Sequence, residues 1–101
     1  MAHELATANK QFRDAVMAVA DAFRAAKTLN ARQEGKIALV TSCLAKGARN
    51  DQTLDALYKM KAAFGPPGFY GEEGPMHDTL AFFFRTWNEW ADVAYGMAAK
   101  R

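Results

Sequence analysis

Apolar residues recur at intervals of three, four or seven positions along most of this chain, and that spacing is the strongest constraint on its fold. In a helix with 3.6 residues per turn, residues spaced in this way lie on one face. Alternation of apolar and polar residues, which is the pattern of a half-buried strand, occurs nowhere in the sequence. We therefore expect an all-α protein.

Capping residues and apolar stripes predict the first two helices near residues 3–28 and 30–47. Asn30 followed by Gln33 resembles a capping box, in which two side chains cap a helix N-terminus, and Gly47 is a natural C-terminal cap. Alanine fills much of the first helix and is the strongest helix former. The side chains expected to face the core are Leu5, Phe12, Val16, Val19 and Phe23 in the first helix and Ile37, Val40 and Leu44 in the second.

The third and fourth helices are expected at about residues 51–64 and 78–99. Asn50 or Asp51 can cap the third helix, and Gly65 with the two prolines after it makes continuation unfavourable. The expected core residues are Leu54, Leu57 and Phe64 in the third helix and Leu80, Phe83, Phe84, Trp87, Ala91 and Ala94 in the fourth. These segments predict a compact bundle of four helices.

The segment GPPGFYGEEGPM, residues 65–76, has glycine at every third position from its first residue and contains all three prolines. A collagen helix needs many such triplets on three chains, so we interpret the segment as one long Gly/Pro-rich loop before the last helix. Either Phe69 and Tyr70 fold back on the core, or the loop binds a partner with Glu72 and Glu73 at its tip. At 101 residues, we expect the chain to form a single helical domain.

The residue types that catalysis and metal binding require are few and scattered. His3, Cys43 and His77 are far apart in the sequence, whereas a zinc site needs three or four ligands at close spacing. The glycine-rich segment lacks both the Lys-Ser/Thr ending and the preceding strand of a phosphate-binding loop. Glu72 and Glu73 are neighbours in a loop, and no rigid frame holds them across a substrate. We expect no metal, no cofactor and no enzymatic activity, with Cys43 as a packing residue.

Three features predict a cytoplasmic protein that does not enter a membrane. One cysteine excludes an internal disulfide and fits a reducing compartment. The opening residues MAHELATANKQF contain an acid and no continuous apolar stretch, so they do not resemble a signal peptide. No segment approaches the ~18 consecutive apolar residues that a membrane span requires.

The charges are unevenly distributed, although the net charge is only +2. Residues 24–61 carry eight Lys or Arg and three Asp or Glu, for a net +5, and residues 62–99 carry one and five, for a net −4. Arg32 and Lys36 are like charges four positions apart near the positive end of a helix, which favours a nearby anion. That anion is a carboxylate of the acidic loop, a nucleic-acid phosphate or a partner's carboxylate. The candidate partner or phosphate contacts are Arg32, Lys36, Lys46 and Arg49.

The fourth helix is apolar over about 220° of its circumference, which is more than one side of a small bundle covers. With Trp87 at the centre of the core stripe, four further apolar residues widen one flank. A helix of this kind is either the central element of its own bundle or is covered by another chain. The residues that we assign to this candidate interface are Phe82, Trp90, Val93 and Met97.

These features favour a small non-enzymatic protein that acts by binding other proteins. Its most concrete form is a phage-type inhibitor, anti-CRISPR-like, that blocks a surface of a larger host complex. One alternative is a small helical subunit of a nucleoprotein complex, which grips the RNA or DNA backbone through the basic middle segment. A second alternative is a homodimeric structural or regulatory protein. The expected partner is thus a larger protein or nucleoprotein complex, a second copy of the chain, or a nucleic acid.

Overall fold

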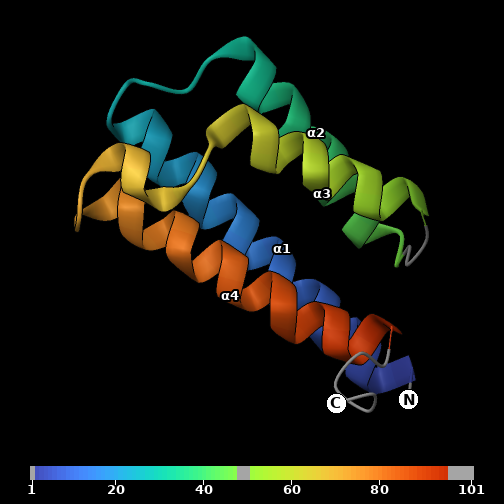
Figure 1. The fold of residues 1–101 in the computed structure, drawn as a ribbon. Helices are drawn as coiled ribbons and strands as arrows, with labels where there is room; N and C mark the ends of the chain where they lie inside the picture. The colour runs from blue at the N-terminus through green and yellow to red at the C-terminus, as the bar shows by residue number, and fades with distance from the viewer. Residues whose placement is uncertain (1, 48–50, 96–101) are drawn as a thin grey trace.

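The chain folds into four α-helices and one short 3₁₀-helix in the computed structural model, which describes residues 2–47 and 51–95 (Figure 1). No strand occurs within these residues, and the prediction of an all-α four-helix bundle is confirmed. The elements in chain order are α1 (Ala2–Ala25), α2 (Ala31–Ala45), α3 (Asp51–Phe64), the 3₁₀-helix η1 (Pro67–Tyr70) and α4 (Pro75–Tyr95).

The helices are arranged as two pairs, with α1 beside α4 and α2 beside α3 (Figure 1). Helix α1 also packs against α2 and so joins the two pairs, while η1 packs against α4. Between the described residues of α3 and α4, no two Cα atoms approach within 8 Å. The bundle is therefore closed along three seams and open along the fourth, between α3 and α4.

Aromatic side chains connect α1 to the rest of the core. Phe12 lies against Phe83 and Trp90 of α4, with ring centroids 5.5 and 5.3 Å away. Near the other end of α1, Phe23 meets Phe64 of α3 edge to face at 4.9 Å. The other large side chains that are fully buried are Leu44, Leu57, Met60, Leu80, Val16, Val19 and Val40. One continuous core thus joins both helix pairs.

Helix α1 ends at Ala25, three residues before the predicted end. The N–H of Thr28 donates to the Phe23 carbonyl at 3.0 Å and the N–H of Lys27 donates to the Arg24 carbonyl at 3.0 Å, which is the Schellman pattern of a helix C-terminus. Lys27 takes the left-handed conformation that this motif requires, with φ of +59°. Glycine usually occupies this position, and lysine seldom does. Because the sequence has no glycine here, it gave no signal for the end of the helix.

The second helix begins and ends where its signals predict. Asn30 accepts a hydrogen bond from the Gln33 N–H at 2.8 Å, and the Gln33 side chain accepts one from the Asn30 N–H at 3.0 Å, so the capping box is present. The Gln33 amide also donates to the Ala63 carbonyl at 3.3 Å and ties the start of α2 to the end of α3. Gly47 follows the helix with φ of +72°, as a C-terminal glycine does.

Helix α4 begins earlier and is rotated compared with the prediction. It starts at Pro75 rather than Asp78, and proline is favoured at the first helical position because its missing N–H is not needed there. We predicted a core stripe centred on Trp87, but Trp87 and Phe84 are only half-buried. The residues of α4 that are buried are Leu80, Phe83, Thr86, Trp90, Ala91 and Ala94.

A buried hydrogen bond accompanies the inward position of Trp90 in α4. The indole N–H of Trp90 donates to the Asn9 side-chain oxygen at 2.7 Å, and both residues are buried. Tryptophan can enter a core in full when its N–H has an acceptor. Trp90 is 1% exposed, so its assignment to an exposed interface flank is wrong.

A candidate protein-binding groove between α3 and α4

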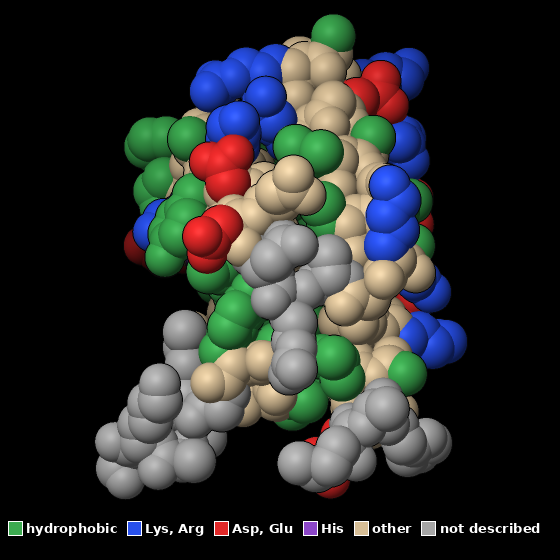
Figure 2. Space-filling view, turned by 90° about the vertical axis from the view of Figure 1, so that its right-hand side faces the viewer, with side chains coloured by type: hydrophobic (Ala, Val, Ile, Leu, Met, Phe, Trp, Pro, Cys, Tyr) green, Lys and Arg blue, Asp and Glu red, His purple; other side chains and the backbone are tan. Residues whose placement is uncertain are grey.

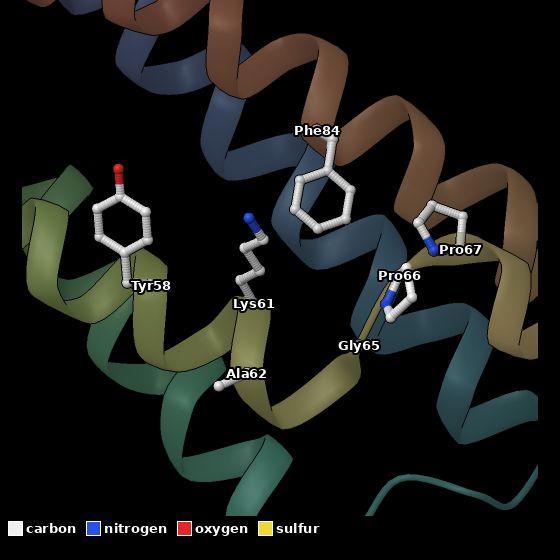
Figure 3. A pocket seen from close by; sticks show the side chains of 7 residues that line it. All are labelled: Tyr58, Lys61, Ala62, Gly65, Pro66, Pro67 and Phe84. Carbon is white, nitrogen blue, oxygen red and sulfur yellow. The ribbon is translucent and has the colours of Figure 1, made fainter.

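The open seam between α3 and α4 forms a groove with a volume of about 630 Å³ (Figure 3). Tyr58, Lys61 and Ala62 of α3 line one side, and Phe84 of α4 lies across from them. Gly65, Pro66 and Pro67, which connect α3 to η1, close one end. A hollow between two helices, walled by aromatic rings and prolines, has the lining that protein segments bind.

A second hollow of about 310 Å³ continues the first one along α4. The two hollows share Tyr58, Lys61 and Phe84, so they form one surface, which we call the α3–α4 groove. The additional residues that line the second hollow are Leu54, Trp87, Asn88 and Ala91.

Three aromatic rings form the wall of the α3–α4 groove. Tyr58 meets Trp87 edge to face with centroids 5.3 Å apart, and this contact bridges the two helices. Phe84 stacks on Trp87 at 6.2 Å, with the rings 19° from parallel. Because these rings hold one another, the wall is formed before any ligand arrives. Tyr58 nevertheless remains 59% exposed, and aromatic rings exposed in this way are typical of the centre of a protein interface.

Lys61 is the one charged residue among those that line the groove. Its amine points into the space between Tyr58 and Phe84 (Figure 3). Within the described residues Lys61 makes no ion pair, whereas its neighbour Lys59 pairs with Asp55 at 2.9 Å. The groove therefore combines an apolar wall with one unpaired positive charge.

The loop before α4 holds Tyr70 inward and Phe69 outward. The Tyr70 hydroxyl donates to the Phe64 carbonyl, its ring meets Phe23 edge to face at 4.9 Å, and burial raises the pKa of the phenol. Phe69 is 75% exposed, and its ring lies where a side chain on Gly65 would be. Tyr70 thus folds back on the core, as one of our two interpretations predicted, whereas Phe69 does not, and binding of a partner by the loop stays a prediction.

The basic residues predicted as partner or phosphate contacts lie on α2 and just after it. Arg32 and Lys46 are exposed and Lys36 is half-buried, and Arg49 falls outside the described residues. None of the three described residues forms an ion pair with the part of the chain that the structure describes. Lys and Arg side chains also stand out in two groups on the end of the bundle that Figure 2 shows. The structure thus supplies no internal carboxylate for Arg32 and Lys36.

The acidic tip of the loop is also unpaired. Glu72 and Glu73 are exposed and make no ion pair within residues 2–47 and 51–95. Compensation of Arg32 and Lys36 by this loop, the first source of an anion that we considered, is therefore absent from the described structure. Both charged surfaces remain open to partners.

The flank of α4 predicted as an interface is only partly exposed. Phe82 and Val93 are 44% and 40% exposed, and the guanidinium of Arg85 lies 5.0 Å from the centre of the Phe82 ring. Trp90 is buried, and Met97 lies outside the described residues. Two isolated apolar side chains make a weaker site than the continuous lining of the α3–α4 groove.

Side chains that bind metal ions do not cluster in the described structure. No group of three or more His, Cys, Asp or Glu residues there could hold a metal ion, and Cys43 is a half-buried thiol on α2. His77 contacts the neighbouring Asp78 carboxylate at 2.9 Å near the start of α4. None of the described helices is long and apolar enough to cross a membrane.

Sequence reasoning missed the α3–α4 groove because it assigned Phe84 and Trp87 to the core and gave Tyr58 no role. One signal was present: α4 holds more aromatic residues than one face of a helix can bury, which we interpreted as an interface on its other flank. Comparison of the chain with protein-family models, curated proteins and solved structures finds no match.

Proposed function

We propose that the protein is a small non-enzymatic protein–protein interaction protein that holds an apolar segment of a larger protein in the α3–α4 groove. The observation that carries this proposal is the open seam, where Tyr58, Phe84 and Trp87 line a hollow of about 630 Å³ and its extension. The anti-CRISPR-like role expected from the sequence is one function of this kind and stays a prediction.

The lining of the groove favours a protein segment as the ligand. Peptide-recognition grooves bind apolar side chains of a helix or an extended chain against aromatic and other apolar surfaces, and a few polar or charged groups set the orientation. Tyr58 and Trp87 supply the aromatic surface, Pro66 and Pro67 supply a rigid end, and Lys61 supplies the charge. A carboxylate placed beside the apolar side chains of the partner would pair with Lys61.

Site-specific photo-crosslinking tests this proposal. A crosslinking amino acid replaces Tyr58 in the groove or, as the control, Leu39, which is 43% exposed on α2. We expect a discrete protein adduct from position 58 and none of the same size from position 39, in a lysate treated with nuclease. Ala62→Arg should abolish the adduct because it fills the groove, whereas Ala38→Arg, at an exposed position of α2, should leave it unchanged.

Two results would contradict the proposal. Equal adducts from positions 58 and 39, or an adduct that Ala62→Arg leaves unchanged, would show that the groove does not bind the partner. Loss of the adduct on nuclease treatment would instead favour the nucleoprotein alternative, in which the bases of α2 grip phosphates. Circular dichroism of each variant serves as the control for folding, because Ala62 and Ala38 are exposed helix positions.

A further inference from the structure

An exposed projection with one aromatic and two acidic side chains adjoins the α3–α4 groove. Phe69 is the most exposed large hydrophobic side chain among the described residues, at 75%. It belongs to η1, whose first residue, Pro67, lies with Pro66 at the end of the groove. Glu72 and Glu73 come just after η1 and are exposed. We call Phe69, Glu72 and Glu73 the acidic knob.

The fold fixes the position of Phe69, the apolar residue of this knob. A Cβ on Gly65 would lie 2.5 Å from the Phe69 ring, so the ring rests against bare backbone at a position with φ of +79°. The Phe69 N–H donates to the Pro66 carbonyl at 3.1 Å, and Tyr70 anchors the turn to the core. Phe69 therefore projects without the loss of conformational entropy that ordering a mobile loop would require.

The charges of the groove and of the knob are complementary. Lys61 points into the groove without a carboxylate partner, and Glu72 and Glu73 lack a basic partner within the described residues. These groups are not paired with each other inside one chain. A second chain can satisfy both, since opposite charges that meet across an interface fix its register.

We propose that a second copy of this chain occupies the groove, in a two-fold symmetric dimer where each copy's acidic knob enters the groove of the other. A two-fold interface uses the same patch on both copies, so the patch must contain both a projection and a matching hollow. The knob and the groove meet this requirement because they adjoin at Pro66 and Pro67. Phe69 then packs on the wall formed by Tyr58 and Trp87, and the carboxylates lie beside Lys61 of the other copy.

This dimer regulates the groove that the proposed function uses. The inference rests on the geometry of the groove and not on the existence of another partner. A groove filled by the knob of a second copy is closed to other segments, so partner binding and self-association compete for it. We therefore expect the adduct of position 58 with another protein to weaken as the protein concentration rises above the dissociation constant of the dimer, while an adduct between two copies of the chain grows.

Sedimentation velocity and light scattering measure the dimer directly. We expect the mass of the protein to rise with concentration from 11.1 kDa toward twice that value. Phe69→Ala should raise the dissociation constant of the dimer at least about tenfold, because it removes the apolar centre of the contact. Phe82→Ala is the matched control, since Phe82 is an exposed phenylalanine outside the groove, and it should leave the constant unchanged.

A charge exchange provides the decisive comparison. Lys61→Glu alone, and Glu72→Lys with Glu73→Lys, should each weaken the dimer, and the triple variant should restore it, because the attraction is re-formed with opposite signs. All of these positions are exposed, so the fold should persist. A protein that stays monomeric up to about 1 mM, a concentration at which even weak dimers form, would overturn the inference and leave the crosslinking test untouched. Weakening by Phe82→Ala with no effect of Phe69→Ala would also overturn it.

Discussion

At the scale of single residues, Asn9 pairs with the inward-facing side of α4 through one buried hydrogen bond. Its side-chain oxygen accepts the indole N–H of Trp90 at 2.7 Å in the interior of the bundle. An acceptor at this point allows the largest side chain of the protein to be buried in full. With Trp90 on the inward side of α4, Phe84 and Trp87 are half-buried and line the α3–α4 groove.

Removal of this acceptor should destabilise the protein. We expect Asn9→Ala to lower the free energy of unfolding by about 1–3 kcal/mol, because the indole N–H of Trp90 would stay buried without a partner. The midpoint of urea unfolding, at an unchanged m-value, measures the effect. In a double-mutant cycle with Trp90→Phe, the Asn9→Ala substitution should cost less once the indole N–H is absent. Additive effects would show that the hydrogen bond contributes nothing.

Tyr70 makes stability depend on pH at the alkaline end. Its pKa is raised above the ordinary value of about 10 because burial disfavours the phenolate. Above pH 10 the unfolded chain therefore loses this proton more readily than the folded chain, and stability falls as the pH rises. Below pH 10 the phenol is protonated in both states, and its contribution to the free energy of unfolding is present in full.

Comparison with Tyr70→Phe isolates this group from the other titrating residues. Near neutral pH we expect the wild type to be more stable by about 1 kcal/mol, because its hydroxyl donates to the Phe64 carbonyl. The advantage should shrink as the pH is raised through 10 and beyond, as followed by urea unfolding at each pH. A constant difference between the two proteins across this range would contradict the assignment.

At the scale of whole elements, the sequence predicted both boundaries of α2, where the capping residues themselves carry the signal. Asn30 with Gln33, and Gly47, mark the ends of α2 correctly. The end of α1 was missed because Lys27 takes a left-handed conformation that glycine usually supplies. The start of α4 was missed although a first-turn signal was present, because Pro75 was assigned to the loop.

Helix α2 carries a charge arrangement that opposes its own stability. Arg32 lies in the first turn, at the positive end of the helix dipole and four residues before Lys36. We expect Arg32→Glu to raise the free energy of unfolding by about 0.3–1 kcal/mol, because glutamate suits the dipole and pairs with Lys36. Arg32→Gln, which only removes the charge, should give a smaller gain in stability. Thermal unfolding of both variants measures the difference. A loss of stability would mean that Arg32 has a partner beyond the described residues.

At the scale of the whole molecule, the α3–α4 groove could not be predicted because it depends on the separation of two helices. A periodic sequence shows that Phe84, Trp87 and Tyr58 are available for packing, but not whether another helix covers them. That depends on how α3 sits once Leu57 and Phe64 pack into the core. The candidate bases of α2 and the loop residues were chosen from the sequence by their charge and position, and their role in binding stays a prediction.

The continuous core predicts that both helix pairs unfold together. Phe12 and Phe23 of α1 contact α4 and α3 respectively, so neither pair keeps its packing when the other is lost. We expect far-ultraviolet circular dichroism, which follows all helices, and tryptophan fluorescence, which follows α4, to give the same thermal midpoint. Two separate midpoints would show that the α2/α3 pair unfolds independently.

The α1/α4 seam also affects the order of events during synthesis on the ribosome. Asn9 and Trp90 are 81 positions apart. Helix α1 therefore cannot pack against α4 until almost the entire described chain has been translated. At about 5–20 residues per second, the 21 residues of α4 alone take about 1–4 s to make. During that interval the aromatic face of α1 around Phe12 has no cover, and a chaperone that recognises exposed aromatic side chains has time to bind it.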